Sequence, residues 1–304
     1  MSSKPKIIAI VGPTASGKTA LAITLSRAHD GEIVSADSRQ IYRGMDIGTA
    51  KPTTEELRAV PHHLIDIKDP DEEYTVAEYK RDAIAAIEDI ARRGKLPILA
   101  GGTGLYVKAV LDNLDIPRVK PDPALRKKIA QEIEEHGLEA AFKRLVALDP
   151  EATYIVDPKN PRRVVRALEV AETTGIPFTA QRKKSEPLFD ACTIGLNPPP
   201  EILHERINAR ADQMMKDGLL KEVKDLVARY DDRLTAFDAI GYREIIAHLR
   251  GTLTLEEAVA LIKTNTWQFA RRQMTWFRND KNIHWIKSAE ANEAENLVRD
   301  FLMK

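Results

Sequence analysis

The sequence predicts an α/β fold in which a parallel sheet is flanked by helices and carries an all-helical insertion. In the first 115 residues, and again after residue 190, short β-branched runs alternate with helical patterns. This alternation is typical of a parallel sheet covered on both faces. Between the two parts, helical periods and proline breaks occur without a convincing strand. We therefore expect a first core part over 1–115, a helical insertion over 116–190, and a second core part over 191–304.

Short apolar runs rich in β-branched residues predict the strands. The expected strands are Ile7–Val11, Glu32–Ser35, His63–Ile67, Leu96–Ala100, Ala191–Leu196 and Ile283–Ile286.

Helices are expected where apolar residues recur at intervals of three and four. The clearest is Thr75–Arg93, which Gly94 ends. Pro121 and Pro123 open another helix, and Gly137 stops it. The further expected helices are one after the glycine-rich turn near residue 18, Leu105–Leu111, Leu138–Leu148, Arg162–Thr174, Ile202–Met215, Leu219–Tyr230, Tyr242–Leu249, Leu255–Phe277 and one at the end of the chain.

Composition narrows the class of protein. The 304 residues hold 46 Lys and Arg against 46 Asp and Glu, so the net charge of zero excludes a globally cationic nucleic-acid coat protein but not a local basic groove. The single cysteine, Cys192, lies in an expected strand, and we interpret it as a core residue in a reducing compartment. Since neither a signal peptide nor a long apolar run is present, we expect a cytoplasmic protein without a membrane span.

One motif carries a direct physical meaning. It matches G-x-x-x-x-G-K-[ST] between a strand and a helix, and its residues are Gly12, Pro13, Thr14, Ala15, Ser16, Gly17, Lys18 and Thr19. Backbone N–H groups and the helix N-terminus converge there on phosphate oxygens, Lys18 adds a full positive charge, and Thr19 can hold Mg²⁺. The motif predicts a P-loop NTPase-like core that binds a diphosphate or triphosphate, as in an NTPase or a small-molecule kinase.

Further motifs make the chain resemble one family, the tRNA dimethylallyltransferases or tRNA isopentenyltransferases. The matching segments are 37–42 (DSRQIY), 44–52 (GMDIGTAKP), 61–66 (PHHLID), 101–106 (GGTGLY), 160–163 (NPRR), 166–169 (RALE), 241–244 (GYRE), 271–273 (RRQ) and 275–278 (TWFR). The chain has no Cys/His finger of the kind that eukaryotic relatives carry, so the resemblance is to the bacterial form.

The resemblance implies a reaction. The dimethylallyl group of dimethylallyl diphosphate is transferred to the exocyclic N6 amine of the adenosine on the 3′ side of the anticodon, in tRNAs that read codons beginning with U. The expected partners are the tRNA anticodon stem-loop and dimethylallyl diphosphate, the expected cofactor is Mg²⁺, and the expected oligomeric state is a monomer.

Residue roles follow from the same resemblance. Lys18 and Thr19 would clamp the diphosphate, and Asp37 would be the general base that takes the amine proton. From the residues alone, Asp37 reads as a strand-end turn or a helix cap. Thr103 would contact the target nucleotide, or it would cap the following helix. The residues Ser38, Arg39 and Gln40 would touch the extruded adenosine and its neighbours.

The insertion contains a basic segment. Between residues 159 and 184, seven Lys and Arg face two Glu, which gives a charge of +5. Such a patch grips a nucleic-acid backbone, although a solvated charged face is the common alternative. The expected tRNA contacts here are Arg162, Arg163, Val164, Val165 and Arg166, with Arg126 carried over from the family.

Other basic residues are weaker candidates. Arg210 is expected to bind the diphosphate, whereas the roles of Arg206, Arg271, Arg272 and Arg278 stay open. We assign His62 and His63 a structural role, because adjacent residues of a strand point to opposite faces and would not share one metal ion.

Three other functions stay open at this stage. One is a kinase that uses ATP at the same loop, and the second is a prenyltransferase that acts on free AMP or ADP. The third is a non-catalytic RNA-binding module.

Overall fold

The computed structural model describes residues 4–117, 119, 122–181, 185–287 and 291–304. They form two compact units, one of residues 1–111 and 188–304 and the other of residues 112–187. The predicted helix opener Pro121 and the basic residues Arg182, Lys183 and Lys184 lie outside the described residues.

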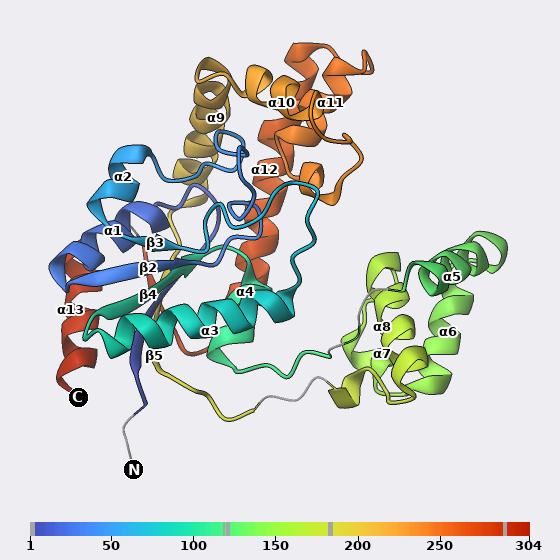
Figure 1. The fold of residues 1–304 in the computed structure, drawn as a ribbon, viewed down its shortest axis with the longest axis horizontal. Coiled ribbons are helices and arrows are strands. Elements are labelled where there is room, and N and C mark those ends of the chain that lie inside the picture. Colours follow the sequence, from blue (N-terminus) through green and yellow to red (C-terminus); the bar gives the residue numbers. More distant parts are fainter. Residues whose placement is uncertain (1–3, 118, 120–121, 182–184, 288–290) are drawn as a thin grey trace. The chain divides into compact units, whose positions relative to one another are not determined.

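The larger unit is built on a six-stranded parallel sheet in the order β3-β2-β4-β1-β5-β6 among the described residues. Figure 1 labels β3, β2, β4 and β5 of this sheet. The strands are β1 Lys6–Val11, β2 Gly31–Ser35, β3 His62–His63, β4 Leu96–Gly101, β5 Asp190–Leu196 and β6 Ile283–Ile286. Their apolar side chains are buried on both faces, as a parallel sheet between helices requires. The predicted α/β class is confirmed.

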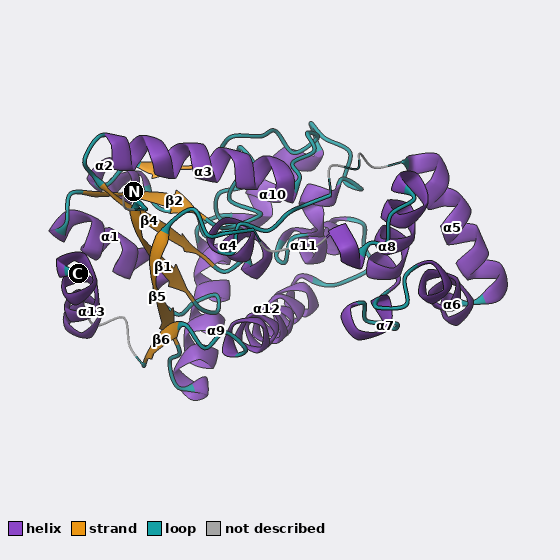
Figure 2. Cartoon of the chain, turned by 90° about the horizontal axis from the view of Figure 1, so that it is seen from below, coloured by secondary structure: helices purple, strands orange, loops and turns teal. Residues whose placement is uncertain are grey.

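Helices cover both faces of this sheet (Figure 2). On one face lie α3 Val76–Arg92 and α4 Gly104–Leu111, and on the other lie α1 Lys18–Ala28 and α13 Ala291–Met303. The remaining helices of this unit are α2 Thr54–Ala59, α9 Pro200–Lys216, α10 Leu219–Val227, η2 Thr235–Asp238, α11 Tyr242–Leu249 and α12 Leu255–Arg278. Thr75 caps α3 in a reciprocal pair with Glu78, which explains why this helix begins where the sequence predicted.

The smaller unit is helical in the part that the structure describes. Its elements are α5 Pro123–His136, α6 Leu138–Leu148, α7 Ala152–Ile155, α8 Pro161–Thr174 and η1 Thr179–Gln181. The helices α5 to α8 share a core around Ile129, Leu145, Val164 and Leu168.

The third expected strand is wrong for most of its length. Only His62 and His63 pair with β2, through Ile33 and Val34. The chain then turns, since Leu64 and Asp66 have φ angles of 64° and 54°, which no strand allows. The short helices α2 and α7 were not predicted, and α10 ends at Val227 rather than at Tyr230.

None of the helices in the described part of the chain is long and apolar enough to cross a lipid bilayer.

Candidate active site

Three neighbouring strands deliver the candidate site at their carboxyl ends. The strands β2, β4 and β1 are adjacent in the sheet. Asp37 follows β2 after one residue, Thr103 follows β4 after one residue, and Gly12 follows β1 directly. Open parallel sheets bind their ligands at this edge. The topology thus brings together groups that lie as far apart as residues 12 and 103 in the sequence.

The loop between β1 and α1 has the backbone of a phosphate-binding loop. Gly12 has a φ of 142°, and a Cβ there would lie 2.7 Å from the carbonyl oxygen of Leu196. The side chain of Ser16 is buried, and its Oγ has no hydrogen-bond partner among the described residues. A buried hydroxyl without a partner costs free energy, so Ser16 fits a site whose ligand supplies the partner.

Lys18 lies inside this loop. Its Nζ donates a hydrogen bond of 2.6 Å to the carbonyl oxygen of Pro13. Burial lowers the pKa of the Lys18 ammonium to about 7, an effect that the charge of Asp37 opposes and that of Arg210 adds to. Burial also lowers the pKa of Arg210. Two desolvated cations therefore lie close together, and an anion between them would stabilise both.

Asp37 forms the turn that the residues alone suggested and also faces the cavity. Its Oδ1 accepts hydrogen bonds from the N–H groups of Arg39, at 2.8 Å, and Gln40, at 3.4 Å. These bonds fix the carboxylate at the end of β2, where it lines the cavity described below. The part that Asp37 plays in this turn is therefore compatible with a catalytic role for its carboxylate.

Thr103 is joined to the loop that carries Asp37. Its Oγ1 accepts a hydrogen bond of 3.1 Å from the N–H of Ser38, and its own N–H donates to the carbonyl oxygen of Ala36 at 3.1 Å. Gly101 permits this approach, because a Cβ there would lie 2.2 Å from the Ala36 oxygen. The hydroxyl thus holds the Asp37–Ser38 backbone.

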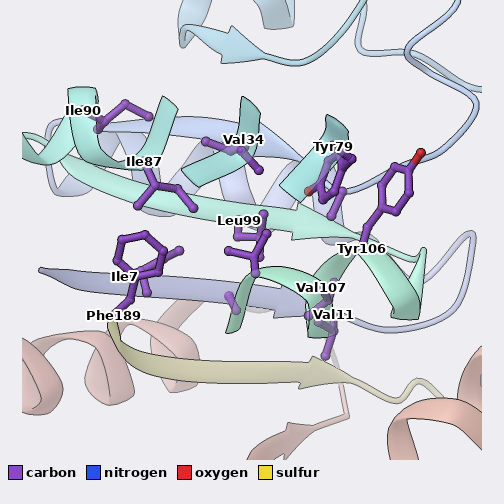
Figure 3. Close-up of a cluster of buried hydrophobic side chains, with 14 of the residues drawn as sticks. Ile7, Val11, Val34, Tyr79, Ile87, Ile90, Leu99, Tyr106, Val107 and Phe189 are labelled. Carbon is purple, nitrogen blue, oxygen red and sulfur yellow. The ribbon is translucent and has the colours of Figure 1, made fainter. Parts of the chain in front are cut away.

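Two stacked tyrosines support the same strand end from the core (Figure 3). The rings of Tyr79 on α3 and Tyr106 on α4 have centroids 3.7 Å apart, and the Tyr79 hydroxyl donates to the carbonyl oxygen of Ser35 at 3.1 Å. Since Ser35 ends β2, this contact fixes the backbone from which Asp37 projects.

Gln273 was not identified from the sequence. This buried residue of α12 accepts a hydrogen bond of 2.8 Å from the Thr14 N–H, and its Nε2 donates to the carbonyl oxygen of Gly102 at 3.0 Å. One side chain therefore joins the phosphate loop to the end of β4. Gln273 lies in the matching segment 271–273, but the sequence did not reveal this role, because the role depends on how α12 packs against the sheet edge.

These elements enclose a cavity of about 290 Å³. Among the predicted residues, the structure places Thr14, Asp37, Ser38, Arg39, Thr103 and Arg210 on its wall. Arg272, whose role was left open, also lines it, and so does Arg243. The side chains of Arg206, Arg271 and Arg278 are exposed. The cavity thus combines two carboxylates, that of Asp37 at a strand end and that of Asp238 in η2, with several guanidinium groups.

Arg39 and Gln40 hold neighbouring loops in this structure. The Arg39 Nη1 donates to the carbonyl oxygen of Thr235 at 2.8 Å, and the Gln40 Nε2 donates to that of Ala50 at 3.1 Å. The loop that contains Ala50 is fixed further by Glu222, whose carboxylate accepts the N–H groups of 46–48 and the hydroxyl of Tyr242. Sequence reasoning missed Glu222.

In the helical unit, a buried carboxylate holds two of the predicted tRNA contacts. Glu169 is fully buried and pairs with Arg126 at 2.8 Å and with Arg166 at 2.6 Å. Burial raises the pKa of Glu169, but hydrogen bonds from Arg126, the Asp122 N–H and Arg166 outweigh it and leave the pKa below its ordinary value.

The other predicted contacts on α8 differ in exposure. Arg162 and Arg163 are exposed, and Val165 is partly buried against the helical core. Val164 is fully buried, so a contact of this residue with tRNA would involve its backbone and not its side chain. The Val164 side chain is buried because it lies in the middle of the apolar face of α8.

Cys192 is a core residue, as the sequence predicted, and His62 and His63 both have partners within the fold. Cys192 is buried in the sheet, and burial raises the pKa of its thiol. His63 pairs with Glu32 at 2.8 Å, while His62 Nδ1 lies 2.8 Å from the carbonyl oxygen of Val60.

Known proteins are similar to this chain over nearly its whole length. The family model described as IPP transferase matches residues 40–280. A tRNA dimethylallyltransferase of Roseiflexus castenholzii is 52% identical, with 91% of each chain covered. One of Symbiobacterium thermophilum is 47% identical over 97% of this chain and 95% of that protein.

Solved structures agree in fold. A tRNA isopentenylpyrophosphate transferase of Bacillus halodurans matches with a TM-score of 0.72 and 41% identity, over 99% of this chain and 95% of that one. A eukaryotic dimethylallyltransferase acting on tRNA matches with a TM-score of 0.82 and 29% identity, over 98% of this chain and 80% of that one. The chain therefore belongs to the IPP transferase family.

Proposed function

We propose that the protein transfers a dimethylallyl group from dimethylallyl diphosphate to the N6 amine of an adenosine in tRNA, and that this adenosine lies on the 3′ side of the anticodon. One observation carries the proposal. Thr14 of the phosphate loop and the carboxylate of Asp37 line a single cavity, which guanidinium groups also line. A phosphate loop alone suits many reactions, but a carboxylate opposite it suits a leaving diphosphate and an amine that loses a proton.

The chemistry requires charge stabilisation at one end of the cavity. The bond between C1 of the dimethylallyl group and the diphosphate oxygen breaks, and the electron pair leaves with the diphosphate. The N–H groups of the loop, the ammonium of Lys18 and the guanidinium of Arg210 stabilise the negative charge that develops there. The cavity walls keep water away from the cationic carbon.

At the other side of the reacting carbon, a base is required. The adenosine amine forms the new C–N bond, and Asp37 accepts the proton that the amine loses. The turn around Asp37 and the Thr103 hydroxyl fix the position of this carboxylate before substrate arrives. An adenosine within an anticodon loop is extruded from its stack to reach the cavity.

A divalent cation fits this donor set only together with the substrate. The described residues contain no cluster of three or more His, Cys, Asp or Glu side chains that could hold a metal ion. Thr19 offers a hydroxyl at the start of α1, and Mg²⁺ commonly binds through such a group, water and substrate phosphates. When bound, Mg²⁺ would add to the stabilisation of the leaving diphosphate.

The helical unit supplies the candidate tRNA surface. Arg162 and Arg163 are exposed at the start of α8, and Arg126 and Arg166 are held by Glu169 beside them. Exposed or fixed cations bind the phosphates of a nucleic-acid backbone. We assign tRNA binding to this unit and the chemistry to the other.

The test is a mass-spectrometric analysis of nucleosides from tRNA treated with the protein. With dimethylallyl diphosphate and Mg²⁺, we expect adenosine that carries one isoprene unit, and cleavage mapping places it beside the anticodon. With ATP in place of dimethylallyl diphosphate, we expect no transfer. Consumption of ATP with a phosphorylated product would refute the proposal, and prenylation of free AMP at the same rate as tRNA would refute its tRNA part.

A further inference from the structure

The cavity has two chemically different ends. The packing of α9 against α12 shows which end lies nearer the phosphate loop. Ile207 on α9 packs with Ala15 of the phosphate loop and with Ala270 on α12. Further along, Asp212 on α9 pairs with Lys263 on α12 at 2.6 Å. The two helices therefore run antiparallel, with one end of their interface at the phosphate loop and the other away from it.

The end away from the phosphate loop is aliphatic. Four residues of α9 line the cavity, and their spacing places them on one face of the helix. They are Ile207, Arg210, Ala211 and Met214. The aliphatic side chains of this part of the wall are Ala211, Met214, Ala239, Ile240 and Ile262, and the polar residues Asp238 and Arg243 line the cavity next to them. All five aliphatic residues belong to one apolar cluster with α10 and α11.

The length of this end fits a short alkyl group. Met214 follows Arg210 by one helical turn, which is a rise of about 6 Å. A dimethylallyl group has three carbon–carbon bonds between C1 and its methyl groups, which span roughly 4 Å. A geranyl group is about twice as long. With its diphosphate at Arg210, a dimethylallyl group would end at Met214, and a geranyl group would collide with it.

We propose that Met214, together with Ile262 on the facing helix, closes the prenyl pocket and limits the donor to five carbons. This inference rests on the proposed function and deepens it. Met214 acts as a specificity-determining residue because its side chain stands where the sixth and later carbons of a longer donor would lie. Beyond it, α10 and α11 supply further apolar side chains, so removal of the thioether opens space that an alkyl chain can fill.

The same end could in principle receive the adenine base, and the chemistry of its walls argues against this. A purine presents nitrogen donors and acceptors around its edge, which aliphatic walls would leave unpaired at a cost. The groups that can pair with them, Asp37, Thr103 and Ser38, are at the strand ends. The Arg243 guanidinium, which lines the cavity near Ile240, is already paired with Glu244 at 2.7 Å.

The experiment compares dimethylallyl and geranyl diphosphate as donors to tRNA, in the full chain. For Met214→Ala we expect the ratio of kcat/KM for geranyl over dimethylallyl diphosphate to rise at least tenfold, since one methylene in an apolar pocket already changes specificity about 10- to 200-fold. For Met214→Phe, kcat/KM for dimethylallyl diphosphate should fall while the KM for tRNA stays unchanged.

Met215→Ala is the matched control, because Met215 is also partly buried in the same apolar cluster but does not line the cavity. It should leave the donor ratio within twofold of wild type. If Met214→Ala fails to fold, Ile262→Val trims the facing wall by one methylene and should raise the ratio about tenfold.

A donor ratio within twofold of wild type in folded Met214→Ala, or a change confined to the KM for tRNA, would overturn the inference and leave the proposed function intact. If wild-type protein transfers neither donor to tRNA, the proposed function fails instead. The two failures are therefore distinguishable in one set of assays.

Discussion

The Gln273 side chain accepts the backbone N–H of Thr14, so a helix near the end of the chain fixes the phosphate loop near its beginning. The same amide donates to Gly102 at the end of β4. Both of its hydrogen-bonding groups are thus used, and no apolar residue could replace it without leaving two backbone groups unpaired.

Replacement of Gln273 by Leu should therefore destabilise the protein and loosen the phosphate loop. Each buried group left unpaired costs about 1–3 kcal/mol, so we expect the free energy of unfolding to fall by a few kcal/mol in urea titration. The KM for dimethylallyl diphosphate should rise as well. Gln268→Leu, at an exposed position of the same helix, is the control and should change neither quantity. Equal stability of the two variants would contradict the bridging role.

Asp37 has two roles, as the hydrogen-bond acceptor of a turn and as the proposed proton acceptor, and mutation can separate them. In Asp37→Asn the amide oxygen still accepts the Arg39 N–H, but the side chain no longer accepts a proton. We expect kcat to fall about 10²- to 10⁴-fold with an unchanged melting temperature, whereas Asp37→Ala should lose both activity and the turn. Full turnover by Asp37→Asn would exclude the carboxylate as the base.

The pKa of Lys18 predicts a pH dependence of diphosphate binding. In the free protein this pKa is about 7, and a bound diphosphate raises it because the anion stabilises the ammonium. Below pH 7 the proton is already present, so the contribution of Lys18 to affinity is complete there. Above pH 7 the proton must be taken up on binding, and affinity should fall by up to about tenfold per pH unit.

Calorimetry in buffers of different ionisation enthalpy measures this proton directly. At pH 8.5, where the diphosphate ester itself is fully ionised, we expect uptake of about one proton per ligand bound. Lys18→Met should bind more weakly and take up none. Binding without proton uptake by the wild type would show that the lysine is already charged in the free protein.

The sequence predicted correctly those features that depend on residues close to one another along the chain. The phosphate loop lies in eight consecutive residues, and capping pairs such as Thr75 with Glu78 mark helix ends within one turn. The third strand failed because the positive φ angles of Leu64 and Asp66 end it, and neither residue is a glycine that would have signalled the turn.

Features that depend on packing between distant segments could not be predicted. Glu222 binds the loop at 46–48 across more than 170 residues, and Gln273 reaches Thr14 across 259. A single polar residue on a helix carries no mark of such a partner. Likewise, the count of charges in the basic segment could not reveal that Glu169 is buried against Arg126 and Arg166 rather than exposed between them.

This burial predicts different outcomes for two arginines of α8. Arg163 is exposed, so Arg163→Gln should weaken tRNA binding, reduce the slope of log affinity against log salt by about 0.7–0.9, and leave stability unchanged. Arg166→Gln removes one partner of a fully buried carboxylate, so it should also destabilise the helical unit. Filter binding at several salt concentrations and thermal melting measure the two effects. Lys143→Gln, at an exposed lysine of α6, controls for loss of charge alone. If Arg163→Gln and Lys143→Gln weaken tRNA binding equally, the start of α8 is not a specific phosphate contact, and the net charge of the unit is what attracts tRNA.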